Sequence, residues 1–527
     1  MKKQFNFTIN HIFFISIAVL FFSICFTKLH NFDFFWHLKA GEEILKNKAF
    51  LYQDIFSYTK EGIQWFNFHI IFQCSIALAN KFFGLFGVTV FKVFLFALIF
   101  LIISLKKNFN IFNSFALFIA ILCLSSRCME RPEIFSYLFI VLMIILLEKP
   151  YTFLNAIFII LIQILMTNSH SIFLTGPSII FIRLVSSLID KKNSKEYLML
   201  LIMAILACAI SPFGFKGLLF PLLDVLPKVL QGSNVYKQTI GEFTSFNVLS
   251  EENLFRIFYF VLAGFTFINF SSRRKFFELF IMLSFAILAL KAVRNFNLFL
   301  FASLGFILNN PDFENLDKKI NSSIKKIFVV ILIFISVFYS WLFSSNKIYY
   351  RYNSLPRFGG GFNESVFSKD LPVFLNNLKG NIKIFNSMSL GGYLIYYVPK
   401  YKVFFDGRLD VYGDEHYVKY LKMISDRSYF FRESLKYGIN VVILNHSINE
   451  GNKLMSLAKE NGWDIGYIDF HAVVFIKQGI VSGYNPINKN NIDGITKRLE
   501  ESINGFDEPE KKLQLNILRL ALNNLFL

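Results

Sequence analysis

The chain has 527 residues, of which 54% are hydrophobic, 18% aromatic and only 17% charged. This composition excludes an ordinary soluble globular protein, in which about 25% of the residues are charged. The net charge of +18 does not indicate a nucleic-acid partner, because the Lys and Arg residues stand in short clusters between apolar runs, as in a polytopic membrane protein.

The first apolar run extends from His11 to Leu29 and follows Lys2 and Lys3. Its length is typical of a helix that crosses a bilayer. Because the run is long and no small-residue cleavage site follows it, we expect a retained anchor instead of a removed signal peptide. With the two lysines in the cytoplasm, this span delivers the next segment to the outer face of the membrane.

That segment is the first outer loop, residues 30–87. It is too polar for lipid, yet it carries two aspartates, Asp33 and Asp54, among aromatic side chains such as Trp36 and Trp65. Trp and Tyr favour the boundary between membrane and water, where a ring is half buried and its polar edge is wet. We therefore expect a catalytic loop that lies on the outer membrane face.

Two helices are expected within this loop. Phe35–Asn47 is amphipathic, with Asp33 at its start, and an N-cap is the alternative role for that aspartate. His69–Phe83 reads as a helix on the membrane surface. The alternative, a true span, would place Lys106 and Lys107 on the outer side, against the charge rule.

Ten further apolar runs are expected to cross the membrane as helices. They lie at about 88–105, 111–126, 134–148, 151–167, 171–189, 197–212, 254–271, 276–291, 295–310 and 327–344. The connections assigned to the cytoplasm all carry Lys or Arg. Residues 1–345 therefore form a polytopic α-helical membrane domain with about eleven transmembrane helices, and the odd count places the C-terminal part outside the cell.

Beyond residue 345 the composition shifts. Gly359–Gly361 looks like a linker, and an extracytoplasmic α/β domain is expected over residues 346–480. Its expected strands are Ile382–Phe385, Tyr393–Val398, Val403–Phe405, Val441–Leu444 and Ala472–Ile476, and its expected helices are Leu371–Leu378, Glu415–Ile424 and Asn452–Glu460. Residues 481–527 form a helical C-terminal tail.

Polar side chains gather at the outer ends of the spans. They are Arg127, Glu130, Arg131 and Glu133 after the third span, His170 after the fifth, Lys291, Arg294 and Asn295 after the ninth, and Asp224, Glu242, Glu251 and Glu252 in the loop over residues 212–253. Charges at this depth are costly unless they are paired or functional. Structural ion pairs of the two arginines with Glu130 and Glu133, and a packing role for His170, are the plain alternatives.

A second polar cluster lies in the segment Phe404–Gly413 of the outer domain. Its members are Asp406, Arg408, Asp410 and Tyr412. A salt-bridged turn is the default interpretation. The functional alternative is contact with an acceptor at the mouth of the site.

Arginines and aspartates at one membrane face suit the displacement of a lipid phosphate from a sugar. Arg binds phosphate with two parallel hydrogen bonds, and Asp accepts the proton of an attacking hydroxyl. Arg294 is the best single phosphate ligand, because few carboxylates lie near it in sequence. The further candidate ligands for the substrate are Asn295, Arg127, Arg131, His37, His69, His170 and Trp36.

Residues 1–345 resemble the GT-C superfamily of membrane glycosyltransferases. The resemblance rests on the outer loop that follows the first span and on two short segments within it, DFFWHLKAGEEIL and QDIFSYT. The resemblance implies a polyprenyl-phosphate-linked sugar donor and a lipid, glycan or protein acceptor among membrane lipids. It also implies an acidic base after the first span, which Asp33 matches by position, with Asp54 second. No cofactor is certain. If a divalent metal, Mg or Mn, is bound, its candidate ligands are Asp33, Asp54 and Glu242. The sequence departs from the family in lacking a clear second acidic motif of the metal-binding type.

The resulting hypothesis is a glycosyltransferase in the bacterial inner membrane that works on its outer face. A transporter or flippase for a lipid-linked glycan is one alternative, although few charged residues stand in mid-span. A non-catalytic membrane scaffold is the other. It predicts that Asp33 and Asp54 share no cavity with the arginines.

Overall fold

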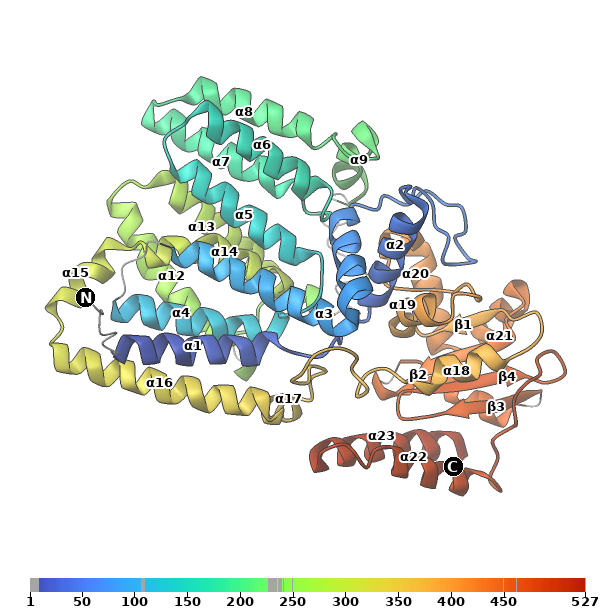
Figure 1. Ribbon diagram of the computed structural model, residues 1–527. Coiled ribbons are helices and arrows are strands. Elements are labelled where there is room, and N and C mark those ends of the chain that lie inside the picture. Colours follow the sequence, from blue (N-terminus) through green and yellow to red (C-terminus); the bar gives the residue numbers. More distant parts are fainter. Residues whose placement is uncertain are drawn as a thin grey trace.

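The computed structural model describes residues 9–105, 110–225, 235, 239, 241–248, 250–448, 450–460 and 462–526. It consists of a helical bundle and a smaller α/β part, with the first outer loop between them (Figure 1). The described chain starts at the end of the bundle that is remote from the α/β part, and its last two helices pack beside the sheet.

Every apolar run that was predicted to cross the membrane contains a helix of the bundle. The bounds are α1 (Ile9–Cys25), α3 (Ile70–Ser104), α4 (Ile111–Leu124), α5 (Glu133–Glu148), α6 (Phe153–Thr167), α7 (Thr175–Asp190), α8 (Ser194–Ala207), α12 (Leu254–Ser272), α13 (Phe276–Lys291), α14 (Phe296–Leu308) and α16 (Ser322–Ser344). The connections contain α9 (Gly214–Phe220), α15 (Pro311–Lys319) and the short turns η1 (Ser125–Arg127), η2 (Pro221–Val225), η3 (Gly241–Phe243), η4 (Glu251–Asn253) and η5 (Val293–Asn295).

Three of the described helices, α3, α12 and α16, are long and apolar enough to cross a membrane. Others are shorter. Helix α14 has 13 residues and α1 has 17, which correspond to about 20–26 Å against a hydrocarbon core of about 30 Å. Large apolar side chains such as Phe153 and Phe334 are more than 70% exposed on the bundle, which suits contact with lipid. The number of spans stays a prediction.

Helix α3 is broken at Gly84, where φ is +64° and ψ is −169°. That backbone geometry is open almost only to glycine. The part before the break lies beside α2, and the part after it enters the bundle (Figure 1). The predicted separate helix over His69–Phe83 is therefore confirmed, while its position on a membrane surface stays a prediction.

Helix α2 (Phe34–Asn47) confirms the other helix predicted in the loop. Its first turns are buried, with Phe34 and Phe35 inaccessible to solvent. Gly41 lets α2 and α3 approach closely, because a Cβ at that position would lie 2.1 Å from the carbonyl oxygen of Gln73. The two helices thus form a compact layer between the bundle and the α/β part.

The α/β part contains one four-stranded sheet in the order β1-β2-β4-β3. Strand β1 (Ile384–Asn386) is parallel to β2 (Val441–Asn445), and β4 (Ala472–Lys477) is antiparallel to both β2 and β3 (Trp463–Ile468). The sheet is accompanied by α18 (Asp370–Asn377), α19 (Met388–Tyr397), α20 (Leu409–Ser425), α21 (Arg427–Tyr437), η6 (His446–Ile448) and η7 (Asn452–Lys459). The predicted helix over Asn452–Glu460 is a run of tight 3-10 turns.

Two strand predictions are wrong. Tyr393–Val398 belongs mainly to α19, which packs its tyrosines against Phe35 of α2, so tertiary contacts override the β-propensity of those residues. Val403–Phe405 contains a bend at Phe404, and among the described residues it pairs only through a single bridge between Ser57 and Val403. Strand β3 was not predicted.

The tail is helical, as predicted, with α22 (Ile492–Ser502) and α23 (Glu508–Phe526). The segment around Gly359–Gly361 follows α17 (Lys347–Arg351) and is held against the end of the first apolar run by bridges from Thr27 and Leu29. It is therefore an ordered connection, and Arg357 within it forms a buried ion pair with Glu510 of α23 at 2.6 Å.

Candidate active site

Asp33 lies directly before α2, where the chain leaves the bundle. Its side chain makes no capping hydrogen bond, so the alternative role as an N-cap is wrong. Instead, its Oδ2 lies 3.1 Å from Nη2 of Arg131, and its Oδ1 accepts a hydrogen bond from Nε1 of Trp36 at 3.3 Å. The side chain keeps 29% of its surface exposed. Asp33 is therefore held in place and remains accessible.

Arg131, in the connection between α4 and α5, holds two carboxylates at once. Its Nη2 faces Asp33, and its Nη1 donates to Oε2 of Glu242 at 2.9 Å. Arg127 shares the same carboxylate oxygen, with Nη1 at 3.5 Å. Residues from three connections that lie far apart in sequence thus meet at one end of the bundle.

Glu133, the first residue of α5, extends this arrangement. Its Oε1 lies 3.4 Å from Nη2 of Arg127 and 3.5 Å from Nη2 of Arg294, whose guanidinium also stacks on the ring of Phe243 at 4.7 Å. The result, called the charge chain below, runs in the order Asp33, Arg131, Glu242, Arg127, Glu133, Arg294. Asn295, next along the sequence, donates instead to the carbonyl oxygen of Leu288.

The sequence offered ion pairs of the two arginines with Glu130 and Glu133 as an alternative. Glu133 does pair with Arg127, but Glu130 pairs with Lys92 instead of either arginine. It accepts the backbone N–H groups of His30 and Asn31 at 2.7 and 3.0 Å, and its Oε2 lies 3.3 Å from Nζ of Lys92. Burial opposes ionisation, but Lys92 and these partners outweigh it and lower the pKa of Glu130 to about 2. This buried carboxylate fixes the backbone that leads into Asp33.

The environment pushes the pKa values of the two acids on Arg131 in opposite directions. Burial raises the pKa of Asp33 above its ordinary value, and Arg131 and Trp36 offset only part of that effect. Burial also acts on Glu242, but Arg131 and Arg127 together hold its pKa below the usual range. Carboxyl groups separated in this way often divide the roles of proton acceptor and fixed charge.

A cavity of about 680 Å³ opens beside the charge chain. Asn31, Phe32, Arg131 and Glu242 line its polar end. Its apolar wall comes from α12 and α16, and α17 adds two cations; these residues are Phe255, Tyr339, Leu342, Phe343, Lys347 and Arg351. The cavity therefore joins an apolar surface to positive charge at Arg131, the partner of Asp33. Neither Asp33 nor Asp54 is among the described residues that line it.

Three histidines and Trp36, the hydrogen-bond donor to Asp33, form a cluster of rings. The ring centroid of His69 lies 5.0 Å from that of His37 and 5.6 Å from that of His170, and His37 stacks on Trp36. Burial lowers the pKa of His69 to about 4 and that of His170 to about 3, so these rings are neutral at pH 7. Nδ1 of His170 shares a hydrogen bond with Ser136 at 2.9 Å, which agrees with a packing role.

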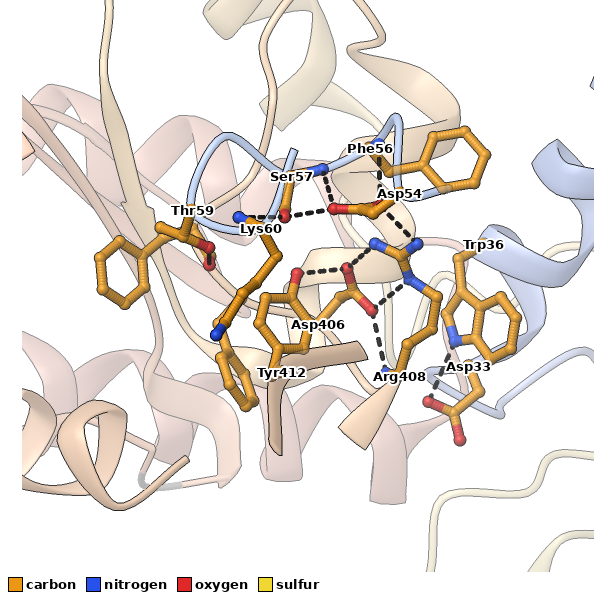
Figure 2. Close-up of polar contacts among 12 residues, drawn as sticks. Asp33, Trp36, Asp54, Phe56, Ser57, Thr59, Lys60, Asp406, Arg408 and Tyr412 are labelled. Carbon is orange, nitrogen blue, oxygen red and sulfur yellow. Dashed lines mark hydrogen bonds and ion pairs between the residues drawn. The ribbon is translucent and has the colours of Figure 1, made fainter. Parts of the chain in front are cut away.

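Asp54 is enclosed in a different cluster, which joins the first outer loop to the α/β part (Figure 2). Arg408, with its side chain fully buried, lies between Asp54 and Asp406 and contacts an oxygen of each at 2.7 Å. Tyr412 donates to Asp406 at 2.7 Å, and Asp54 also accepts the backbone N–H groups of Phe56 and Ser57. These contacts match the salt-bridged turn and leave Asp54 with no exposed surface.

The segment that carries Arg408 also reaches Asp33. Gly407 packs directly on the Asp33 carboxylate, while Asp33 itself lies outside the Arg408 cluster and bonds to Trp36 (Figure 2). Asp410, at the start of α20, is exposed. The α/β part thus forms one wall of the site through a glycine.

The candidate metal ligands do not gather into a metal site. Among the residues that the structure describes, no group of three or more His, Cys, Asp or Glu side chains is arranged to hold a metal ion. Asp33 and Glu242 lie on opposite arms of Arg131, and Asp54 is bound to Arg408. The side chain of Asp224 lies outside the described residues. We therefore derive no step through a metal.

Sequence reasoning did not single out Lys347 and Arg351 as site residues. Both follow the last span on the side assigned to the outside, where positive charges are unusual. Two cations on that side could have marked them in the sequence as candidate site residues. Conversely, Arg294 is engaged by Glu133 and is not among the residues that line the cavity.

No protein-family model matches the sequence, and no curated protein matches it either. Solved structures match in fold. The archaeal oligosaccharyltransferase AglB from Archaeoglobus fulgidus, in complex with an inhibitory peptide and a dolichol-phosphate, gives a TM-score of 0.56 at 12% identity over 89% of this chain and 74% of that one. The oligosaccharyltransferase of the same organism in complex with Zn and sulfate gives 0.51 at 12% identity over 88% and 73%.

ArnT from Cupriavidus metallidurans, bound to undecaprenyl phosphate, gives a TM-score of 0.47 at 10% identity over 90% of this chain and 98% of that one. This chain therefore shares the fold of the two oligosaccharyltransferase structures. The resemblance predicted from the first loop is confirmed at the level of the fold.

Proposed function

We propose that this chain is a GT-C glycosyltransferase that moves a sugar from a polyprenyl-phosphate donor to an acceptor at the outer face of a bacterial inner membrane. The observation that carries the proposal is that the partly exposed Asp33 binds Arg131, and Arg131 lines the polar end of an amphipathic cavity. The fold supports the donor class, because a structure with the same fold holds a dolichol-phosphate.

The donor occupies the 680 Å³ cavity in this proposal. Isoprene units lie against the apolar side chains of α12 and α16, and the phosphate meets Lys347, Arg351 and Arg131 at the cavity's edge. The side chain of Arg351 is 71% exposed, and its ion pair with Glu251, at 3.7 Å, is long and lies at the surface. Its guanidinium can therefore turn toward a phosphate. Arg294 and Arg127 add long-range positive charge from within the charge chain.

The reaction is a displacement at the sugar's anomeric carbon. The acceptor hydroxyl forms the new C–O bond, Asp33 takes its proton, and the bond from the anomeric carbon to the phosphate oxygen breaks with its electron pair leaving on the polyprenyl phosphate. Arg131 holds the Asp33 carboxylate in position, and the raised pKa of Asp33 makes it a better proton acceptor than an ordinary aspartate. Asp54 takes no part, since Arg408 occupies it.

The test measures release of polyprenyl phosphate from a polyprenyl-phosphate sugar by the purified full-length protein. Asp33→Asn keeps the size of the side chain and removes the proton acceptor, so turnover should fall at least about 100-fold. Asp493→Asn, on the exposed face of α22, is the matched control and should retain full activity. Full activity of Asp33→Asn would refute the mechanism.

A second test uses cells. A deletion strain should lose one sugar modification of a lipid, glycan or protein of the envelope. The wild-type gene and Asp493→Asn should restore that modification, and Asp33→Asn should not. Accumulation of an intact lipid-linked glycan at the inner face would instead support a flippase.

A further inference from the structure

The guanidinium of Arg131 stands between two carboxylates of the charge chain. Its Nη2 lies 3.1 Å from Oδ2 of Asp33, and its Nη1 lies 2.9 Å from Oε2 of Glu242. The sequence offers both acids as candidate ligands of a divalent metal. An ion shared by them would have to take the position of this guanidinium, because each acid already directs an oxygen at it. The positive charge beside Asp33 therefore comes from the protein itself.

The remaining oxygens of the candidate ligands also have partners. Oδ1 of Asp33 accepts a hydrogen bond from Nε1 of Trp36 at 3.3 Å. The third candidate, Asp54, is fully buried and is bound by Arg408 at 2.7 Å (Figure 2). Mg²⁺ requires carboxylate oxygens in direct contact, at about 2.0–2.1 Å. At both aspartates these oxygens already bind a guanidinium or an N–H group.

The charge chain is balanced by its own side chains. Three carboxylates alternate with three guanidiniums, and each neighbouring pair lies within 3.5 Å. The carboxylates are Asp33, Glu242 and Glu133, and the guanidiniums are Arg131, Arg127 and Arg294. A divalent cation is stable where carboxylates outnumber cations, because like charges a few ångströms apart repel. An ion added to this chain would meet three fixed positive charges and no surplus carboxylate among its six members.

A neutral side chain also helps to hold Arg131 in place. Oδ1 of Asn31 lies 3.4 Å from Nη2 of Arg131 and accepts the backbone N–H of Asp33 at 3.0 Å. Asn31 is itself fixed, because its own backbone N–H donates to the buried carboxylate of Glu130 at 3.0 Å. The side chain of Arg131 keeps only 19% of its surface exposed. The segment before Asp33 thus forms a seat for this guanidinium, which is an ordered element of the site.

We propose that Arg131 takes the place of a divalent metal ion at this site, so that sugar transfer needs no metal. The inference deepens the proposed function and rests on it for the reaction, although its metal-binding test does not. One arm of the guanidinium orients the Asp33 carboxylate for proton transfer. Its charge also faces the 680 Å³ cavity, where negative charge develops on the departing phosphate. A guanidinium suits this position because it stays charged and presents paired N–H groups to carboxylate and phosphate.

Metal binding is measured on the purified full-length protein in detergent, after removal of metals with EDTA. The probe is Mn²⁺, because the electron paramagnetic resonance signal of the free ion weakens when the ion binds. The comparison with Asp33→Asn separates this site from any weak binding elsewhere on the surface. The wild type should take up no more Mn²⁺ than Asp33→Asn does. Uptake of one further ion by the wild type would overturn the proposal.

Two substitutions of Arg131 form a matched pair for the same measurement. Arg131→Ala leaves Asp33 and Glu242 facing one another without a cation, so it should bind Mn²⁺ at least about tenfold more tightly than the wild type. Arg131→Lys keeps a positive charge and should bind no more than the wild type. The added binding should disappear in the double variant Arg131→Ala, Glu242→Gln. Equal binding by Arg131→Ala and Arg131→Lys, both folded as judged by elution and thermal unfolding, would reject the replacement.

The reaction supplies a measurement that needs only the wild type. Release of polyprenyl phosphate by the metal-free protein should stay within about twofold of its rate in Mg²⁺ or Mn²⁺. A loss of at least about tenfold in EDTA that either metal restores would overturn this inference and leave the proposed function standing. Absence of transfer under all these conditions would refute the proposed function, while the Mn²⁺ measurements would still decide whether Arg131 occupies a metal position.

Discussion

A Cβ on Gly407 would lie only 1.8 Å from Oδ1 of Asp33. Gly407 belongs to the α/β part and Asp33 to the first outer loop, so the two parts of the molecule meet at the proposed base. The contact explains why a residue without a side chain stands between Asp406 and Arg408. It also ties the geometry of the site to the way the α/β part docks.

The substitution Gly407→Ala should therefore move the Asp33 carboxylate. We expect turnover to fall about 100-fold, because displacement of a catalytic group by about 1 Å has that effect, while the protein stays folded. Release of polyprenyl phosphate measures the loss. Gly494→Ala is the control, since nothing lies within 4 Å of a Cβ at that position in α22. Unchanged activity of Gly407→Ala would remove Asp33 from the reaction.

The rate should depend on pH through Asp33. A base acts only when deprotonated, so activity should be low below the pKa of Asp33 and rise to a plateau above it. Because burial raises that pKa, the rise should lie above the range of an ordinary aspartate. The pH dependence of kcat/KM reports it.

Trp36→Phe sharpens this test. The indole N–H of Trp36 donates to Asp33 and favours its charged form, so its removal should shift the rise in activity to higher pH. Trp463→Phe, in β3, should leave the profile in place. A profile that does not respond to Trp36→Phe would mean that another group sets the pH dependence.

Asp54→Asn should affect stability more than the chemical step. It leaves the fully buried guanidinium of Arg408 with one carboxylate fewer, and the loss of one partner from such a pair costs about 3–5 kcal/mol of unfolding free energy. Lys402 and Glu61 join the same two parts at the surface, where both are exposed. Lys402→Met should therefore cost less than about 1 kcal/mol. Thermal unfolding of the two variants in detergent compares them, and equal stability would contradict the role given to Arg408.

Glu130→Gln should destabilise the protein in a pH-dependent way. The folded-state pKa of Glu130 is lowered to about 2 from 4.5, so its contribution is fully present above about pH 4.5 and is lost as the pH falls toward 2. At pH 7 the variant leaves Lys92 without its counter-charge, at a cost of about 3–5 kcal/mol. The difference in stability between wild type and variant should shrink on acidification. A constant difference would show that Glu130 is not ionised in the fold.

Periodicity and charge predicted the local features of this chain, and contacts between distant segments decided the rest. Gly84 sits between two apolar runs, so a break in α3 was visible in the sequence. The pairing of Arg131 with Glu242 was not, because 111 residues separate them and Glu130 and Glu133 were nearer partners. Tyr393–Val398 has the composition of a strand, yet its tyrosines pack on Phe35 as part of a helix.

Lys347→Gln tests the donor site that the sequence did not reveal. Lys347 lines the 680 Å³ cavity, and its ammonium lies 4.1 Å from the ring centroid of Trp341. If it binds the donor phosphate, the variant should raise the KM for the donor about 10- to 100-fold, since a hydrogen bond to a charged group contributes about 1.5–3 kcal/mol. The turnover number should change little, because Lys347 does not touch Asp33 or Arg131.

Lys369→Gln, whose lysine pairs with Glu364 on the exposed surface, should leave both constants unchanged. An unaltered KM in Lys347→Gln would move the phosphate away from α17 and toward the charge chain.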